Sequence, residues 1–219
     1  MLPFETEKNI AFIHAGANDG VSNDWIFKSA TQNDWKGVCL EPQPDSYKKL
    51  CLAYENYPNI TPLCGALASE KGEFPLHSFS SPDPEFFDVF DKLSSFDLDL
   101  LVKNVEVELS SRPELKKRVG NILKRVRSQM VRCYTTEELL RDFISNPDLI
   151  SLDIEGYEAK IIEGFPFEKI KPKYIFFEAF HMHPDEKSKC LNRLSLEGYS
   201  FVGAKEYGIE DFNILAVRT

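Results

Sequence analysis

Short apolar runs alternate along the chain with segments of helical periodicity, and this alternation is typical of an α/β protein. The apolar runs predict strands of a mostly parallel sheet that helices cover on both faces. The predicted strands cover residues 10–15, 37–41, 60–67, 74–79, 131–135, 149–155, 174–180, 199–205 and 212–219. The predicted helices cover residues 23–31, 44–54, 136–140, 157–163 and 185–196.

Turn and capping residues place several of the helix ends. Pro44 suits the first turn of the second helix, because its missing N–H is not needed there. Thr135 or Thr136 is suited to cap the helix that follows, since a threonine hydroxyl can accept a free backbone N–H. Gly164 ends the next helix, where we expect a left-handed C-cap.

The last two predicted strands are joined by a short turn around Gly208, so they must run antiparallel. We therefore expect a doubly wound, Rossmann-like α/β sheet that is mostly parallel and closes with an antiparallel C-terminal hairpin. This hairpin is rare in dinucleotide-binding sheets.

The alternation breaks after Pro82. Residues 84–128 carry helical patterns in two or three segments, at 84–93, 98–109 and 113–126. We expect residues 81–130 to be a helical insertion, or lid, within a single domain that spans residues 1–219.

The charge of the chain is unevenly distributed. The 219 residues carry a net charge of −9, which disfavours nucleic acid as a partner. Residues 112–132 nevertheless hold eight basic side chains and one acid, which we expect on a basic helix. This helix fits an acidic acceptor molecule, or it pairs with the acidic body of its own domain or of a second subunit in a homo-oligomer.

The composition also indicates a compartment. The N-terminal segment lacks the features of a secretory signal, and no apolar run reaches the roughly 18 residues of a membrane helix. The five cysteines form no CxxC pair. Buried thiols in a reducing cytosol are therefore expected, and a cytoplasmic location with them.

A glycine turn follows the first strand, where open α/β sheets bind their ligands. The segment runs from His14 through Gly16, Asn18 and Asp19 to Gly20. Its G-x-x-x-G spacing differs from the G-x-G-x-x-G pattern that seats a diphosphate, and Asp19 would repel one. The turn suits a ligand that carries an amine and a sulfonium, although a plain glycine turn explains the pattern as well.

An acid follows the second strand, at Glu41, with Pro42 after it. An acid about 20 residues beyond the glycine turn is placed to accept both ribose hydroxyls of a nucleoside, although such a residue can also be a solvated strand end. Ala66 lies at the end of the third strand and adds a small apolar surface that suits an adenine ring.

The densest group of acids lies in the segment from Leu152 to Glu158. We expect Asp153 and Glu155 to share one face of a strand end, because side chains alternate along a strand. Glu178 is a third acid, inside the buried strand at 174–180. Glu158 is expected to cap a helix. Two carboxylates in a dry cleft need a cation, a shared proton or nearby donors.

Two histidines, His181 and His183, follow Glu178 in the chain. Together with Asp153, Glu155 and Glu178 they could form a divalent metal site, such as one for Mg²⁺, or one of them could be a general base. Loop residues without such a role are the plainer interpretation.

Four motifs resemble a known family when they are taken in order. GANDG, LEP, GALAS and LDIEGYE, spread between about residues 10 and 180, are similar to the motifs of FkbM-type methyltransferases. The resemblance implies a class I methyltransferase fold with S-adenosylmethionine as the methyl donor. It also implies that the acceptor is a hydroxyl of a sugar, a glycan or a secondary metabolite.

The resemblance also implies roles for residues of this chain. The methionine part of the cofactor would lie on Gly16, Ala17, Asn18, Asp19 and Gly20. Glu41 would bind the ribose, Asp153 would lie near the sulfonium, and Glu155 and Glu178 would face the acceptor. His14 departs from the family pattern, which has an acid here to meet the cofactor's ammonium group; Asp19 or a water molecule would have to replace that contact.

We therefore expect a methyltransferase in which Glu155, Glu178 or His181 removes the acceptor's hydroxyl proton. A nicotinamide-dependent oxidoreductase is the second interpretation, and the glycine spacing counts against it. A methyltransferase fold that binds without catalysing is the third, and His14 is the feature that favours it.

Overall fold

The computed structural model describes residues 2–22, 24–79, 90, 93–180, 182–203 and 213–219. The chain divides into two compact units. The larger unit comprises Met1–Gly72 and Arg132–Thr219, and the smaller unit comprises Glu73–Val131. The expected single domain with an insertion at 81–130 stays a prediction.

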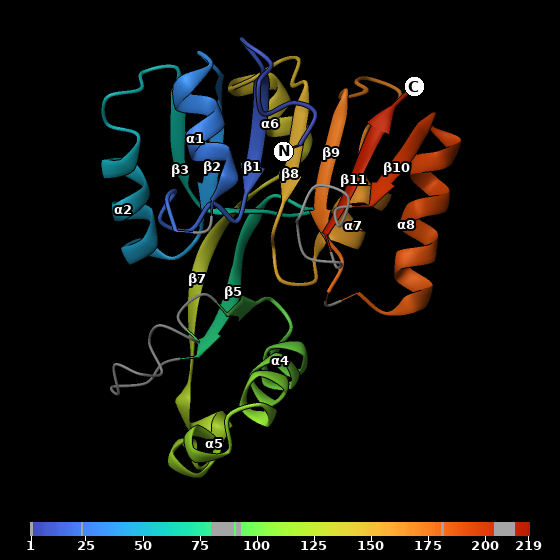
Figure 1. Ribbon diagram of the computed structural model, residues 1–219. Helices are drawn as coiled ribbons and strands as arrows, with labels where there is room; N and C mark the ends of the chain where they lie inside the picture. Colours follow the sequence, from blue (N-terminus) through green and yellow to red (C-terminus); the bar gives the residue numbers. More distant parts are fainter. Residues whose placement is uncertain (1, 23, 80–89, 91–92, 181, 204–212) are drawn as a thin grey trace. The chain divides into compact units, whose positions relative to one another are not determined.

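Seven of the described strands form the sheet of the larger unit (Figure 1). They are β1 (Ala11–Ala15), β2 (Lys36–Glu41), β3 (Ile60–Cys64), β8 (Leu149–Leu152), β9 (Tyr174–Glu178), β10 (Tyr199–Gly203) and β11 (Asn213–Arg218). Their order across the sheet is β10-β11-β9-β8-β1-β2-β3.

The direction of the strands follows the expectation from the sequence. β1 pairs in parallel with β2 and β8, β2 with β3, and β8 with β9. β11 runs antiparallel to both β9 and β10. The mostly parallel sheet with an antiparallel C-terminal pair is thus confirmed, while the turn predicted around Gly208 lies outside the described residues. The insertion of β11 between β9 and β10 was not predictable from the short connection alone.

Helices cover both faces of this sheet (Figure 1). They are α1 (Trp25–Gln32), α2 (Pro44–Ala53), α6 (Thr136–Asp142), α7 (Glu158–Glu163) and α8 (Pro184–Leu196). Alternate residues of β1 enter two different cores. Phe12 packs with residues of α1 and α2, whereas Ile13 packs with residues of α6, α7 and α8. The doubly wound arrangement is therefore confirmed, and each helix that the structure describes is too short or too polar to span a bilayer.

The caps of these helices explain where they begin and end. Asp24 caps α1 by accepting the N–H of Ile26 at 2.8 Å, and Thr135 caps α6 by accepting the N–H of Glu138 at 3.1 Å. Gly164 is the C-cap of α7 as predicted, but its φ is −87°, so the expected left-handed conformation is wrong. Its N–H bonds back to Lys160 and the chain leaves the helix in a right-handed turn.

The predicted strand at 60–67 is two strands. β3 ends at Cys64, and β4 (Ala66–Leu67) pairs in parallel with the Cys133–Tyr134 end of β7 (Val126–Tyr134). The break falls at Gly65, where an added Cβ would lie 2.6 Å from the carbonyl oxygen of Arg132. This close approach needs glycine, and the sequence around Gly65 alone does not reveal its distant partner.

The smaller unit combines strands and helices. It contains β5 (Gly72–Phe79) from Glu73 onward, β6 (Ser94–Ser95), α4 (Leu98–Ser110), α5 (Pro113–Val119), the 3₁₀ turn Ile122–Arg125 and the Val126–Val131 part of β7. Leu101, Val105 and Leu109 on one face of α4 pack with Phe79 and other buried apolar residues. The helix expected at 98–109 is confirmed as α4, the one expected at 113–126 is confirmed only as far as Val119 in α5, and most of the segment at 84–93 lies outside the described residues.

The basic segment at 112–132 is not one helix. α5 ends at Gly120, which has a φ of +66°, and the chain continues as the 3₁₀ turn and then as β7. The strand expected at 131–135 thus begins earlier, at Val126. Glycine ends the helix because it adopts a positive φ without the steric cost of a Cβ.

The segment after β8 forms a turn that one buried glutamate organises. The strand ends at Leu152, and Glu155 has a φ of +57°. The carboxylate of Glu158 accepts the N–H of Ile154 at 2.7 Å and that of Gly156 at 3.0 Å. The expectation that Asp153 and Glu155 share one strand face is therefore wrong, because the chain has left the extended conformation there. The capping role expected for Glu158 is wrong, because the N-cap of α7 is Tyr157 and the carboxylate binds N–H groups of the turn that precedes the helix.

Burial raises the pKa of Glu158 to about 8, and the nearby charges of Asp153 and Glu155 raise it further, while the hydrogen bonds oppose the shift. In the unfolded chain the same carboxyl loses its proton near its ordinary value of 4.5. Between these two pH values the folded protein holds the extra proton, so Glu158 contributes less stability as the pH rises.

We predict that Glu158→Gln gains stability relative to the wild type as the pH rises from about 5 to about 8, by at most about 1.4 kcal/mol per pH unit. The variant also loses an acceptor oxygen, which lowers its free energy of unfolding by an amount that does not depend on pH. Urea unfolding at several pH values measures the difference in free energy of unfolding between the variant and the wild type. The exposed Glu163→Gln on the same helix is the control, and a Glu158→Gln offset that does not vary with pH would contradict the assignment.

Candidate functional site

The carboxyl ends of β1, β2, β8 and β9 lie along one edge of the sheet, because these strands are parallel and adjacent. Ligands of open α/β sheets bind at this edge, where the connections leave the sheet on opposite sides. The segments that follow these strands carry most of the residues that the sequence singled out. The site is therefore built from four strand ends.

The turn after β1 is held against its neighbours by backbone contacts. The N–H groups of Gly16 and Ala17 both donate to the carbonyl of Leu40 at 3.0 Å. The backbone N–H of Asp153 donates to the carbonyl of Ala15 at 3.0 Å. Gly16 has a φ of +84°, and an added Cβ would lie 1.7 Å from the carbonyl oxygen of Asp153. Glycine is required here because the backbones after β1 and β8 touch.

Glu41 joins the same turn to the end of β2 through its side chain. One carboxylate oxygen accepts the N–H of Asn18 at 2.9 Å, and the other accepts the N–H of Gln43 at 2.8 Å. Glu41 is only 5% exposed. Burial raises its pKa to about 7; the two hydrogen bonds oppose this, and the charges of Asp153 and Asp19 add to it. Asp153 and Asp19 therefore both lie close enough to Glu41 to repel its charge.

Asp19 organises the second half of the turn. Its carboxylate accepts the N–H groups of Val21 and Ser22 at 3.0 and 2.7 Å, and the hydroxyl of Ser22 at 2.6 Å. Gly20 has a φ of +76° and packs against Leu50, where an added Cβ would be 2.6 Å from a side-chain carbon. Asp19 thus has a structural role in the loop beside the cofactor role that the sequence suggested.

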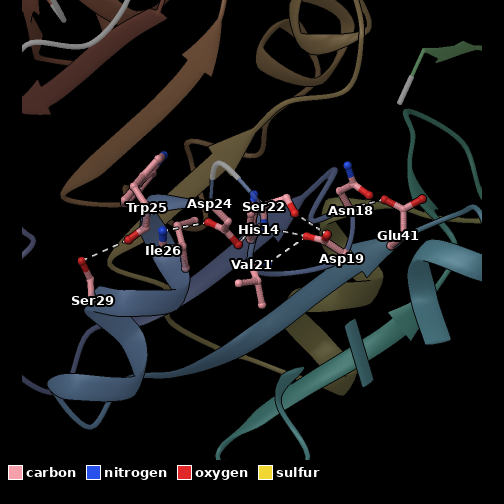
Figure 2. A network of polar contacts seen from close by, with 10 residues as sticks. All are labelled: His14, Asn18, Asp19, Val21, Ser22, Asp24, Trp25, Ile26, Ser29 and Glu41. Carbon is pink, nitrogen blue, oxygen red and sulfur yellow. Dashed lines mark hydrogen bonds and ion pairs between the residues drawn. The ribbon is translucent and has the colours of Figure 1, made fainter. Parts of the chain in front are cut away.

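His14 and Asp24 form a buried pair beneath the turn. The Nδ1 atom of His14 lies 3.7 Å from the Oδ2 atom of Asp24, and each side chain is 7% exposed. Burial lowers the pKa of His14, which Asp24 partly offsets, and burial raises the pKa of Asp24. Figure 2 shows Glu41 and Asn18 on one side, the Asp19 turn in the middle and the His14–Asp24 pair beyond it.

Sequence reasoning missed Asp24. The available signal was its position directly before a helix, where aspartate is a preferred cap. Its contact with His14 depends on the path of the loop between them, which spacing does not reveal.

The three acids proposed as metal ligands occupy different settings. Asp153 is exposed directly after β8, and Glu155 is half-buried in the following turn. Glu178 is the last residue of β9 and half-buried, not inside a buried strand as expected. Nowhere in the described ranges do three His, Cys, Asp or Glu side chains gather as a metal site would require. The magnesium site expected at Asp153, Glu155 and Glu178 is therefore not supported by the residues that the structure describes.

The two histidines differ as well. His183 caps α8, because its Nδ1 accepts the N–H of Asp185 at 3.4 Å while Glu186 accepts the N–H of His183 at 3.0 Å. A role in metal binding or proton transfer is not needed to explain it. His181 lies outside the described residues.

The remaining candidates lie on neighbouring segments. Pro42 is half-buried after Glu41, and Ala66 is 6% exposed in β4. Two of the motifs meet directly, because the hydroxyls of Ser69 and Tyr157 are 3.0 Å apart. Sequence reasoning assigned Tyr157 no role. Its contact with Ser69 joins two segments that are distant in the chain.

The chain matches the family described as Methyltransferase FkbM domain over residues 14–208. No curated protein is detectably similar to it in sequence. Among solved structures, the methyltransferase FkbM from Methylobacillus flagellatus KT is similar with a TM-score of 0.55 and 14% identity, over 96% of this chain. This chain spans 44% of the length of that protein.

A fibrillarin from Aeropyrum pernix, solved with natively bound S-adenosyl-L-methionine, aligns with 99% of this chain and 70% of its own, at 10% identity and a TM-score of 0.49. The order of the strands in the sheet agrees with the family match over residues 14–208. The chain has the class I methyltransferase fold and belongs to the FkbM methyltransferase family.

Proposed function

We propose that the protein transfers a methyl group from S-adenosylmethionine to a hydroxyl of a sugar, a glycan or a secondary metabolite. The observation that carries the proposal is the buried Glu41, which holds the turn after β1 beside Asp153 at the carboxyl edge of the sheet. Membership of the family supports the reaction class.

The charges at this edge fit the proposed cofactor. Asp153 and Asp19 each repel the charge of Glu41, and this repulsion adds to the effect of burial on its raised pKa. A ligand with a sulfonium and an ammonium group would relieve the repulsion, whereas the diphosphate of a nicotinamide cofactor would add to it. The site therefore favours S-adenosylmethionine over the oxidoreductase alternative.

Each part of the cofactor has a place in the proposal. The backbone from Gly16 to Gly20 takes the methionine part, and Asp153 lies beside the sulfonium. Glu41 accepts the ribose hydroxyls, for which each carboxylate oxygen keeps a second lone pair. Pro42 and Ala66 supply apolar surface for the adenine.

The side chains of this protein must then position and deprotonate the acceptor hydroxyl. S-adenosylmethionine, when bound, supplies an electrophilic methyl group. The protein must hold the acceptor oxygen in line with it and remove the hydroxyl proton. Glu155 and Glu178, after neighbouring strands, are proposed for this proton, together with His181. A metal ion has no part in this proposal, because no cluster of three metal-ligating side chains is found within the described part of the chain.

An acidic acceptor is proposed on the basis of charge. Lys116, Lys117 and Arg118 are consecutive exposed residues in the last turn of α5, and an anionic sugar would complement their charge. Lys117 also pairs with Glu114 at 3.1 Å, so part of this charge is balanced within the helix.

We predict that isothermal titration calorimetry detects binding of S-adenosylhomocysteine and no binding of NADH. Glu41→Gln is expected to weaken S-adenosylhomocysteine about 10- to 100-fold, because hydrogen bonds to a charged group contribute roughly 1.5–3 kcal/mol. The affinity of the wild type should also fall as the pH drops below about 7, where Glu41 gains a proton. Glu55→Gln, exposed after α2, is the control; tighter binding of NADH would refute the proposal.

We further predict that the protein converts S-adenosylmethionine to S-adenosylhomocysteine faster with uronic-acid oligosaccharides as acceptors than with neutral ones.

Glu155→Gln or Glu178→Gln should lower kcat about 10²- to 10⁴-fold, the usual contribution of a general base, and leave S-adenosylhomocysteine affinity unchanged. Glu163→Gln serves as the matched control. If both variants keep full activity, neither carboxylate takes the proton, and binding without turnover on every acceptor would favour a non-catalytic module.

A further inference from the structure

The buried pair of His14 and Asp24 leaves two polar atoms unsatisfied. The Nδ1 of His14 and the Oδ2 of Asp24 are shielded from solvent, and neither has a hydrogen-bond partner among the described residues. Their separation of 3.7 Å is an ion-pair contact and too long for a hydrogen bond. Buried polar atoms of this kind are rare in folded proteins and call for an explanation.

The residues around His14 and Asp24 do not explain why these two polar atoms are buried without a hydrogen-bond partner. His14 lies beside Cys39 in the pairing of β1 with β2, and the charge of Asp24 reaches Cys39 and Tyr54, whose pKa values are raised mainly by burial. Asp19 is the other charged group that acts on Asp24. Among the described residues, the charged groups that act on Asp24 are therefore His14 and Asp19, and burial disfavours the protonated form of His14.

The location of the pair relates it to the turn. His14 stands two residues before Gly16, and Asp24 caps α1, which begins directly after the turn. The two side chains therefore flank both ends of the loop that is proposed to hold the methionine part of the cofactor. Figure 2 shows them facing each other, with Ser22 and the Asp19 turn alongside.

The net charge of the His14–Asp24 pair suits a cationic group of a ligand. A neutral imidazole and a carboxylate together carry one negative charge, the same as a single acid at position 14 would. Here the negative charge is on Asp24, at the start of α1, and it lies beneath the same turn after β1. In a buried setting a carboxylate acts on a cation over several ångströms, so direct contact is not required.

We infer that the His14–Asp24 pair selects the α-ammonium group of the cofactor's methionine part, with Asp24 supplying the charge and His14 positioned by it under the turn. This inference rests on the proposed function. It assigns to Asp24 the electrostatic role for which the sequence offered Asp19 or a water molecule.

Two ligands separate this role from cofactor binding in general. S-adenosylhomocysteine carries the amino-acid part with its ammonium group, and 5′-methylthioadenosine shares the adenosine and the thioether but lacks that part. A residue that acts on the ammonium group affects the first ligand alone. A residue that holds the loop or the ribose affects both.

The variant Asp24→Asn removes the charge and keeps a side-chain oxygen that can cap α1, because asparagine is a preferred cap. We expect it to weaken S-adenosylhomocysteine tenfold or more in calorimetry and to change the affinity for 5′-methylthioadenosine less than twofold. The double variant His14→Asp with Asp24→Asn returns the charge to position 14 and should restore the preference for S-adenosylhomocysteine. Glu41→Gln, which acts on the ribose, should weaken both ligands.

The other outcomes overturn the inference in distinguishable ways. Equal weakening of both ligands by Asp24→Asn would mean that the pair only supports the loop, and no effect on either would remove the role altogether. Failure of the double variant to restore the preference would show that the charge is not the cause. If the wild type binds neither ligand, the proposed function itself fails.

Discussion

One buried carboxylate sets the geometry of the candidate site. Glu41 accepts backbone N–H groups from the turn after β1 and from the start of the connection after β2, so the two strand ends are fixed to each other. Gly16 brings the same turn against the backbone at Asp153. Three segments that are far apart in the sequence are thereby held at one edge of the sheet. Loss of the Glu41 contacts would leave two partly buried donors unsatisfied, which is costly.

The second feature of the site is an excess of negative charge that the fold tolerates at a cost. Burial raises the pKa of Glu41 and Glu158, and neighbouring carboxylates raise both further. Such shifts gather where a protein binds or reacts, since a purely structural core avoids repelling groups. In the function that we propose, this charge and the His14–Asp24 pair favour a cationic ligand at the edge of the sheet.

The sequence predicted the parts of the fold that depend on local patterns. The alternation of strands and helices, the antiparallel C-terminal pair and the cap at Thr135 are all confirmed, because periodicity and capping chemistry act within a few residues. The features that it missed depend on distant partners. Gly65 divides a strand because of Arg132, and the turn after Leu152 exists because Glu158 accepts its N–H groups. The Asp24 contact with His14 likewise required the path of the loop.

The central claim is that the ends of β1, β2 and β8 form a single binding site for a sulfonium nucleoside. A crystal structure of the protein grown with S-adenosylhomocysteine tests it most directly. The account predicts the ribose hydroxyls on Glu41, the amino-acid part over the turn from Gly16 to Gly20 and the sulfur beside Asp153. A ligand bound elsewhere on the chain, or a ribose turned away from Glu41, would contradict it.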